Sequence, residues 1–370
     1  MTFYPRNGII ITNEIYSGKR SFAYGVFDRR IVVLSVTRKD IARMAGVSTA
    51  TVSYVINNSN RVGEKTKERI WEIIEKNDYK PNQVARTMVT NRSMQIAFLV
   101  DNLFNTFFSE IVTFFETCAA EKGYFVSICS SEHNMANYID SFRSRQLDGV
   151  FSMVTPQKID MQLLYKLTEN GIPVLVSGNP VADTSKVSLI EPDYVEGMRT
   201  ILKYLKENGH SKIAYLSEFS PEFKYDTRLG SFVNGYDELF DKDEKIVVTP
   251  DELFLDREKN YVALTDKLLA AGKEIDAVVT VCDEMAITCM ERLRERGVRV
   301  PDDISVVGID NITFGRHAIV PLTSLGFDKQ RFAKDAFEML YSAMMNGTVE
   351  SRKTPMFITE RKSVKKKKIV

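Results

Sequence analysis

Long apolar runs, cysteine pairs and paired histidines are all missing from this chain of 370 residues. No apolar run approaches the roughly 18 to 20 residues that cross a bilayer, and the first residues lack the cationic stretch and apolar core of a secretory signal. The four cysteines are Cys118, Cys129, Cys282 and Cys289, and they form no CxxC pair. This spacing favours free thiols in a cytoplasmic protein. We therefore expect a cytoplasmic protein without a membrane partner.

Motifs of catalysis are absent as well. The three histidines are scattered and no two have metal-ligand spacing. No GxSxG, P-loop or HExxH motif occurs, and no cysteine–histidine arrangement stands out. The sequence thus offers no catalytic residue, no metal site and no cofactor motif, and it argues against an enzyme.

The formal net charge of +1 hides an asymmetry along the chain. Residues 1–95 carry 16 Lys and Arg against 8 Asp and Glu, whereas residues 96–370 carry 34 against 41. A basic head on an acidic body points toward a polyanionic partner for the head. Chance fluctuation would give the same balance, so charge alone does not decide.

Both ends of the chain look unlike its body. Residues 1–35 show no periodicity, and we expect an unstructured extension that is not translated if Val36 is the true start, because a GTG start codon read internally encodes valine. The end, 362–370, reads as a solvated basic tail, with a weak contact to DNA phosphates as the minority interpretation.

Residues 37–80 predict three short helices. Thr37 and Asp40 form an N-terminal capping pattern, Gly46 permits a tight turn, and Ser48 caps the second helix. Two helices joined by a turn around a glycine are typical of a helix-turn-helix. The apolar positions at helical spacing are Ile41, Met44 and Ala45, then Val52, Val55 and Ile56, and finally Ile70, Trp71, Ile73 and Ile74 in a helix from Glu64 to Lys76.

The pattern beyond residue 94 changes to apolar segments that alternate with helix candidates of 12 to 20 residues. Such alternation predicts parallel sheets covered on both faces, in two α/β lobes, with ligands bound outside the carboxyl ends of the strands. The predicted strands are 95–100, 124–129, 149–154, 173–177, 212–217, 276–281 and 303–309.

One segment of about 50 residues carries a specific order of motifs. It holds the turn AGVS, the TVS of the second helix, a V-x-x-x-T-x-x-R-I third helix and a Y-x-P-N-x-x-A-R stretch. This segment closely resembles the DNA-binding headpiece of the lactose-repressor (LacI/GalR) family, and the resemblance continues across nearly all of the chain. It implies an all-α helix-turn-helix headpiece followed by a two-lobed periplasmic-binding-protein-like sensor of the α/β class.

The resemblance also implies a function and its partners. We expect a ligand-responsive transcription regulator, most often a repressor in the family, which binds double-stranded operator DNA as a homodimer. Induced release is the commoner mode and corepression the minority mode. The tail has no leucine heptads, which favours a dimer over a tetramer. The implied domains are the headpiece at 36–80, a hinge at 81–94 and an effector domain at 95–361, with lobe 1 at about 95–191 and 326–352 and lobe 2 at about 193–322 and 353–361.

Three positions of the second helix match the base readers of the family: Thr49, Ala50 and Tyr54. Threonine can hydrogen-bond, alanine can touch a thymine methyl, and tyrosine has a hydroxyl and a ring. Many members have an arginine where Tyr54 stands, which puts a common guanine contact in doubt. Four further residues fit phosphate contacts or helix caps equally well: Thr37, Ser48, Thr51 and Ser53.

The hinge resembles a family segment that becomes helical on operator DNA, where a leucine wedges between base steps. Met88 occupies that position, and Arg86 would approach a phosphate or the groove floor. An inert linker is the alternative. The predicted DNA contacts of the hinge are Asn82, Ala85, Arg86 and Met88.

Four residues are predicted for the effector site: Phe107, Arg228, Asp283 and Asp310. The segment VDNLFNTFFSEI resembles D-x-x-N-P-F-F, although Thr106 replaces the proline, and of the two aromatics we assign Phe107 to the cleft. Arg228 matches a ligand-binding arginine of the family. Asp283 matches an aspartate that accepts bonds from sugar hydroxyls, and it can also be a helix N-cap.

Asp310 ends another predicted strand, with cleft and cap roles equally supported, whereas Asp193 and His210 are expected to be structural.

Within the family a sugar or sugar phosphate is the leading effector class, and nucleosides and purines are also represented. The alternative function is a sugar-binding protein that serves a membrane transporter. Such a protein would share the two-lobed body but would have a signal peptide and no headpiece.

Overall fold

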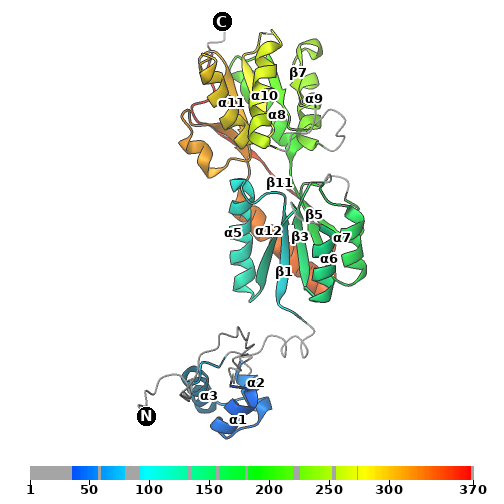
Figure 1. Cartoon of the computed structure of the whole chain (residues 1–370), viewed down its shortest axis with the longest axis vertical. Helices are drawn as coiled ribbons and strands as arrows, with labels where there is room; N and C mark the ends of the chain where they lie inside the picture. Colours follow the sequence, from blue (N-terminus) through cyan, green and yellow to red (C-terminus); the bar gives the residue numbers. More distant parts are fainter. Residues whose placement is uncertain are drawn as a thin grey trace, which may run out of the picture. The chain divides into compact units, whose positions relative to one another are not determined.

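The computed structural model describes residues 36–56, 60–79, 92–131, 135–155, 158–179, 182–219, 226–251, 256–272 and 274–367. The chain forms two compact units, residues 1–81 and residues 82–370. We call the first the headpiece and the second the body, and Figure 1 shows the elements of each. In the described residues, no helix has the length and apolar character needed to cross a membrane.

The headpiece consists of α1 (Arg38–Ala45), α2 (Thr49–Ile56) and α3 (Glu64–Lys76). Thr37 and Asp40 form the predicted capping box, in which each side chain accepts a hydrogen bond from the other residue's backbone N–H. Gly46 ends α1 at φ 61°, a left-handed conformation that glycine adopts without a steric penalty. The predicted turn between α1 and α2 is therefore confirmed.

The headpiece core differs from the prediction at two large side chains. Its buried residues include Ile41, Ala42 and Ala45 of α1, whereas Met44 is exposed. Successive helix residues are about 100° apart, so Met44 lies roughly 100° from the middle of the buried stripe. Trp71 of α3 is exposed for the same reason, beside the buried Ile70. The predicted apolar faces of α1 and α3 therefore each included one exposed residue, Met44 and Trp71.

The body contains two sheets of six strands, one in each lobe. All neighbouring strands run parallel except β10 and β12, which are antiparallel. Lobe 1 has the order β11-β5-β4-β3-β1-β2, with β1 Gln95–Val100, β2 Phe125–Ser130, β3 Gly149–Met153, β4 Val174–Val176, β5 Ser188–Pro192 and β11 Ser351–Thr354. Lobe 2 has the order β12-β10-β9-β8-β6-β7, with β6 Ile213–Leu216, β7 Ile246–Val248, β8 Ala277–Thr280, β9 Ser305–Ile309, β10 Thr323–Gly326 and β12 Phe357–Thr359.

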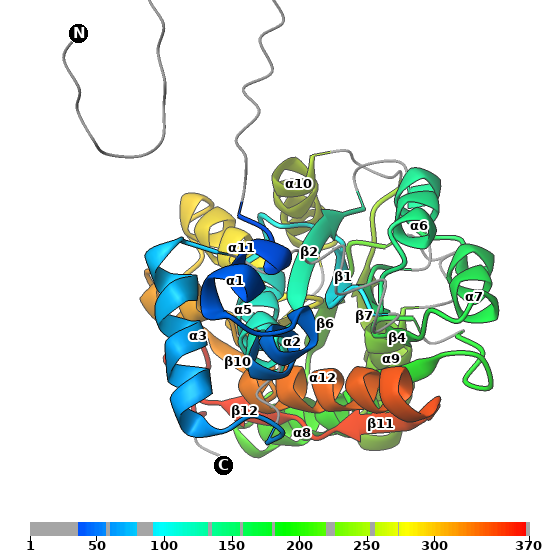
Figure 2. The same cartoon turned by 90° about the horizontal axis from the view of Figure 1, so that it is seen from below.

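Helices cover both faces of each sheet, as the alternating pattern predicted. In lobe 1, α5 (Thr106–Glu121) and α12 (Lys329–Asn346) pack on one face, and α6 (Met135–Ser144) and α7 (Met161–Glu169) on the other (Figures 1 and 2). In lobe 2, α8 (Tyr194–Glu207) pairs with α9 (Thr227–Leu239), and α10 (Arg257–Ala270) pairs with α11 (Asp283–Glu295). Two short 3-10 helices complete lobe 2, η1 (Lys242–Glu244) and η2 (Thr313–His317).

Within the described residues, the chain passes between the lobes at three places. The crossings follow β5, β10 and β11. The sequence predicted that the chain leaves lobe 2 near residue 322 and leaves lobe 1 again near residue 352. The strands place 323–326 in the sheet of lobe 2 and 351–354 in the sheet of lobe 1, so both crossings come a few residues later. All three crossings leave from the same edge of the sheets, so the carboxyl ends of the strands of both lobes face the region between them.

Residues 362–367, the described part of the predicted tail, are docked on lobe 2 rather than solvated, contrary to the prediction. Ser363 and Val364 are buried, and the Ser363 hydroxyl donates to the carbonyl of Val306 in β9. The Lys367 ammonium donates to Asp276, and its N–H donates to the carbonyl of Asn208. Lys365 pairs with Asp302 and Lys367 with Asp276, which a count of charges along the sequence cannot show.

Candidate DNA interface and ligand cleft

The predicted base readers lie on the outer face of α2. Thr49 and Ala50 are exposed in its first turn and Tyr54 is 38% exposed, while Val52 and Val55 face the core. The Ser48 hydroxyl caps the helix by accepting a hydrogen bond from the N–H of Thr51 at 3.1 Å. The structure therefore leaves the three positions open to a partner on a helix whose start is fixed.

Tyr54 has a neighbour that the sequence analysis missed. The Arg61 guanidinium carbon lies 5.4 Å from the centre of the Tyr54 ring, and Arg61 Nη1 donates to the Tyr54 hydroxyl at 3.4 Å. The adjacent Val62 is buried in the headpiece core. A cation is thus held on the exposed face of α2, although no residue of that helix is basic.

Some of the other predicted DNA contacts are helix caps in the structure, and others lie outside the described residues. Thr37 caps α1 and Ser48 caps α2, and the hydroxyls of Ser48 and Thr51 lie 2.9 Å apart. Their cap roles are observed, and their phosphate contacts stay predictions, as does that of Ser53. Four hinge positions lie outside the described residues: Asn82, Ala85, Arg86 and Met88.

Arg228 is the centre of a polar cluster at the carboxyl ends of the lobe 2 strands. It lies in the first turn of α9, which Asp226 caps by accepting from the N–H groups of Arg228 and Leu229. Its guanidinium donates to the carbonyl of Val281 at 2.9 Å and to the Tyr194 hydroxyl at 2.9 Å. These bonds fix the plane of the guanidinium beside the cleft.

Asp310 lies next to Arg228 and has a strained backbone. Its Oδ1 is 3.5 Å from Arg228 Nη2, and its φ of 109° lies in a region that favours glycine. Burial raises the pKa of Asp310 to about 6, although the charge of Arg228 opposes the rise. The structure therefore brings the predicted Arg228 and Asp310 together.

The surroundings of Asp283 differ from those expected of a helix N-cap. It is the first residue of α11, its side chain makes no cap bond, and it is fully buried. Its carboxylate accepts from the N–H of Ile312 at 2.8 Å and from the Ser324 hydroxyl. Burial and the charge of Asp310 raise the pKa of Asp283 to about 8. Asp283 thus supports the turn that carries Asp310, and the expected N-cap role is wrong.

Phe107 is the more deeply buried of the two aromatics that open α5. It is 5% exposed and packs edge-on against Phe327, with ring centres 6.0 Å apart, while Phe108 is half-buried. The assignment of Phe107 rather than Phe108 to a ligand stays a prediction. The structure places Phe107 in the core of lobe 1.

Several further residues near Arg228 carry no motif in the sequence. Tyr194 begins α8 and stacks on Arg228, and Glu191 is the last residue but one of β5, where its carboxylate accepts from the N–H of Asn179 at 3.1 Å. Burial raises the pKa of Glu191 to about 7. Glu218, after β6, forms a two-bond ion pair with Arg257 at the start of α10. Only their positions at strand and helix ends could have drawn attention to them.

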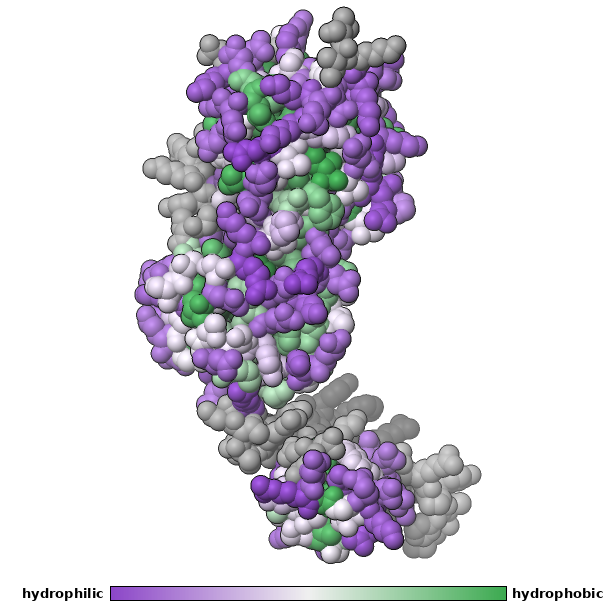
Figure 3. All heavy atoms as spheres, turned by 180° about the vertical axis from the view of Figure 1, so that it is seen from behind, coloured by the Kyte–Doolittle hydropathy of each residue, from purple (hydrophilic) through white to green (hydrophobic). Residues whose placement is uncertain are grey.

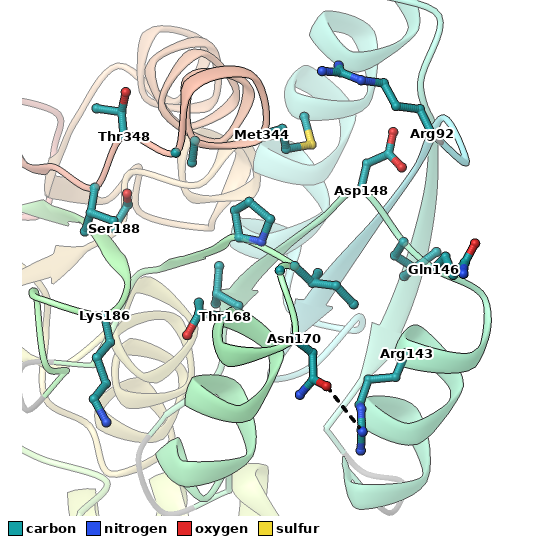
Figure 4. Close-up of a pocket in the computed structure, with 18 of the residues that line it drawn as sticks. Arg92, Arg143, Gln146, Asp148, Thr168, Asn170, Lys186, Ser188, Met344 and Thr348 are labelled. Atoms are coloured by element: carbon teal, nitrogen blue, oxygen red, sulfur yellow. Dashed lines mark hydrogen bonds between the residues drawn. The ribbon is translucent and has the colours of Figure 1, made fainter. Parts of the chain in front are cut away.

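A large hollow lies at the opposite edge of the lobe 1 sheet (Figure 4). Its volume is about 1200 Å³, and its lining residues include Arg92, Arg143, Asp148 and Lys186. In its lining, Arg143 Nη2 donates a hydrogen bond to Asn170 Oδ1 at 3.4 Å. Because this hollow lies at the amino ends of the strands, it is separate from the polar cluster around Arg228. Among the described residues, no group of three His, Cys, Asp or Glu side chains could hold a metal ion.

Comparison with known proteins matches both units. A family model for bacterial regulatory proteins of the lacI family matches residues 37–82, and one for a periplasmic binding protein-like domain matches residues 202–364. The HTH-type transcriptional repressor PurR of Vibrio cholerae is 32% identical over 339 residues, covering 89% of this chain and 98% of the relative. That of Aliivibrio fischeri is 31% identical over 324 residues, covering 85% of this chain and 94% of the relative.

Solved structures show the same fold. A lac repressor dimer bound to operator and the anti-inducer ONPF has a TM-score of 0.76 at 23% identity, covering 89% of this chain and 99% of that one. The regulator CelR in complex with cellobiose has a TM-score of 0.64 at 24% identity, with the same coverage. The full-length match to the repressors includes the headpiece, which a transport protein would lack. This chain belongs to the LacI family of bacterial regulatory proteins and is a DNA-binding transcription repressor, not an enzyme.

Proposed function

We propose that the protein binds a palindromic operator as a homodimer in the cytoplasm and is controlled by a small molecule of the sugar class in the cleft between its lobes. In this proposal α2 reads bases in the major groove, and Thr37, Ser48, Thr51 and Ser53 contact phosphates. The segment around Met88, in a hinge at 81–94, enters the minor groove, and residues 95–361 form the effector domain.

The observation that carries the effector proposal is the polar cluster around Arg228, at the carboxyl ends of strands from both lobes. Asp310 and Glu191 offer acceptors and Arg228 is a fixed donor, which suits hydroxyl groups that both donate and accept. Parallel α/β sheets bind ligands at this edge. The similar structure of CelR contains cellobiose, which supports a carbohydrate as the effector class.

Two apolar surfaces support the homodimer. The edge strand β2 exposes Phe125 (68%) and Ile128 beside α5. In lobe 2, a hollow of about 270 Å³ next to α11 is lined by Ile287, Met290 and Ile319, and Ile319 is 65% exposed. Helices α5 and α11 lie on the same side of the body in both ribbon views (Figures 1 and 2). A second copy of the chain related by a two-fold axis would cover both surfaces at once.

The face of the molecule seen in Figure 3 is mainly hydrophilic, with hydrophobic residues in separate patches. Such small patches are usual on monomer surfaces and need no partner.

The mechanism requires that the effector bind the two lobe arrangements with different affinity, typically by about 1–3 kcal/mol for each coupled site.

The test begins with selection of binding sites from random duplexes by the purified full-length protein. The expected result is a two-fold symmetric sequence, bound with an affinity that falls steeply with salt. A thermal-shift screen of sugars, sugar phosphates, nucleosides and purines then identifies the effector. Arg228→Ala is expected to abolish the shift and the effector response while operator binding persists. The control is Arg199→Ala, at a half-buried arginine of α8 that pairs with Glu196 and Glu238. No sequence preference would refute operator binding, and a shift retained in Arg228→Ala would refute the cleft site.

A further inference from the structure

The recognition helix contains no side chain that can make a two-bond contact with a base. Residues 49–56 read TATVSYVI, without arginine, lysine, asparagine or glutamine. Those four side chains make the two-bond contacts to guanine and adenine that discriminate most strongly between base pairs. Helix α2 alone therefore has hydroxyls, a methyl group and a tyrosine ring with which to read sequence.

Arg61 supplies the missing group from outside the helix. Its guanidinium is held against the exposed Tyr54 by the ring contact at 5.4 Å and by the hydrogen bond at 3.4 Å. Burial of the next residue, Val62, fixes the backbone at this point. A guanidinium held between a buried neighbour and a ring loses less conformational freedom on binding than a free surface arginine.

We propose that Arg61, positioned by Tyr54, is a base-reading residue that contacts a guanine in each half-site of the operator. The planar fork of the guanidinium matches the O6 and N7 acceptors of guanine in the major groove. Tyr54 orients the fork by stacking and by accepting one of its hydrogen bonds. This inference rests on the proposed function, because it requires α2 to lie in the major groove.

A phosphate contact by Arg61 is the competing outcome, and the two differ in measurable ways. Loss of a phosphate contact weakens binding about equally for all sequences and lowers the salt slope by about 1, whereas loss of a base contact relaxes specificity at one position. A good two-bond base contact discriminates by roughly 5- to 150-fold.

The experiment compares site selection by the full-length wild type, Arg61→Met and Arg61→Lys. The expected result is a guanine that wild type selects at one position of each half-site and that Arg61→Met accepts in exchange for other bases, with less than about 3-fold preference left. Lysine keeps the charge and can reach guanine but lacks the planar fork that stacks on Tyr54, so Arg61→Lys is expected to retain the salt slope and only part of the preference. Tyr54→Leu should lose the preference as well, and Tyr54→Phe should keep most of it.

The control is Arg43→Met, which removes the same charge from the exposed end of α1. It is expected to leave base preferences unchanged. Circular dichroism and the fluorescence of Trp71 in α3 verify that each variant headpiece is folded. If Arg61→Met keeps the wild-type preference at every position, or loses affinity uniformly, the inference is wrong. If wild type itself selects no sequence, the proposed function fails instead.

Discussion

Glu110 and Lys329 form an ion pair in lobe 1, and both bind the same turn of lobe 2. The Lys329 ammonium lies 2.7 Å from Glu110 Oε2 and donates to the carbonyl of Asn311 at 2.7 Å. Glu110 Oε1 accepts from the N–H of Thr313 at 2.9 Å. Burial disfavours the Glu110 charge, but these hydrogen bonds outweigh it and lower the pKa of Glu110. Because Asp310 begins this turn, the pair joins the polar cluster around Arg228 to lobe 1.

Loss of the Lys329 charge is expected to destabilise the body. Lys329 is only 8% exposed, so Lys329→Met removes the ammonium from Glu110 and leaves the backbone carbonyl of Asn311 without its donor. We expect the free energy of unfolding to fall by about 2 to 3 kcal/mol, the usual scale for hydrogen bonds to charged groups. Urea unfolding followed by circular dichroism measures the change, while Trp71 fluorescence reports the headpiece separately.

The matched control for this prediction lies on the same helix. Lys334 is exposed and 4.0 Å from Glu338, so Lys334→Met is expected to change stability by less than about 0.5 kcal/mol. Equal losses in the two variants would mean that the Glu110–Lys329 pair contributes no more than a surface pair. The double exchange Glu110→Lys with Lys329→Glu restores the ion pair but reverses both bonds to the turn, so it should recover only part of the stability.

Two glycines of lobe 2 are expected to respond to alanine with opposite signs. A Cβ at Gly308 in β9 would overlap the Asp283 carboxylate and lie 2.9 Å from Leu322 Cδ2, whereas a Cβ at Gly230 in α9 meets nothing within 4 Å. Gly308→Ala should therefore lower the free energy of unfolding by about 1–3 kcal/mol. Gly230→Ala should raise it by about 0.5–1 kcal/mol, because glycine is a poor helix former. Urea unfolding checks both, and stabilisation by Gly308→Ala would contradict the buried position of Asp283.

Local patterns predicted much of the fold. The run QIAFLV is β1 to the residue, and the spacing of Ile70 and Ile74 gave α3 its observed bounds. These elements succeed because their signals, apolar runs and helical periods, lie within the element itself. The short strands β5, β7, β10, β11 and β12 were missed. β11 reads SRKT and is held by its neighbour β5, so no apolar run marks it.

The site could be predicted only in part, for a related reason. Arg228 was found by its match to the family and Asp310 by its place at a strand end, and the two do meet. Their neighbours Tyr194 and Glu191 come from the crossing between lobes. The choice between Phe107 and Phe108 depends on helix rotation, since adjacent residues point about 100° apart. The stacking of Arg61 on Tyr54 depends on the path of a loop. Contacts between distant segments leave no local pattern in the sequence.

Charge on the apolar surfaces is expected to dissociate the proposed homodimer. Ile319→Asp places a carboxylate in the α11 hollow, where association would have to bury it without a partner. We expect the dimer dissociation constant to rise at least about 10-fold, which corresponds to 1.4 kcal/mol. Sedimentation equilibrium measures it. Val195→Asp, at an exposed apolar residue of α8, is the control and should leave the dimer intact. Equal behaviour of the two variants would exclude the α11 surface as the interface.

Glu191 is expected to make the body less stable as the pH rises. Burial raises the pKa of its carboxyl from 4.5 to about 7, and no cation lies within 4 Å of it among the described residues. The fold therefore binds this proton more tightly than the unfolded chain does. Its stabilising contribution is complete below pH 4.5 and is lost as the pH rises to about 7. Asp310 and Asp283 act in the same direction with pKa values of about 6 and about 8.

Glu191→Gln isolates the share of this one group. The amide oxygen can still accept from the N–H of Asn179, but it carries no charge to bury. At pH 8 the variant should be more stable than wild type by about 1 to 3 kcal/mol, since one unit of pKa shift is worth about 1.4 kcal/mol. The difference should vanish below about pH 5. Urea unfolding at pH 5, 6.5 and 8 measures it, with the exposed Glu207→Gln as the control. A difference that does not change with pH would mean that packing, rather than a buried charge, distinguishes the two proteins.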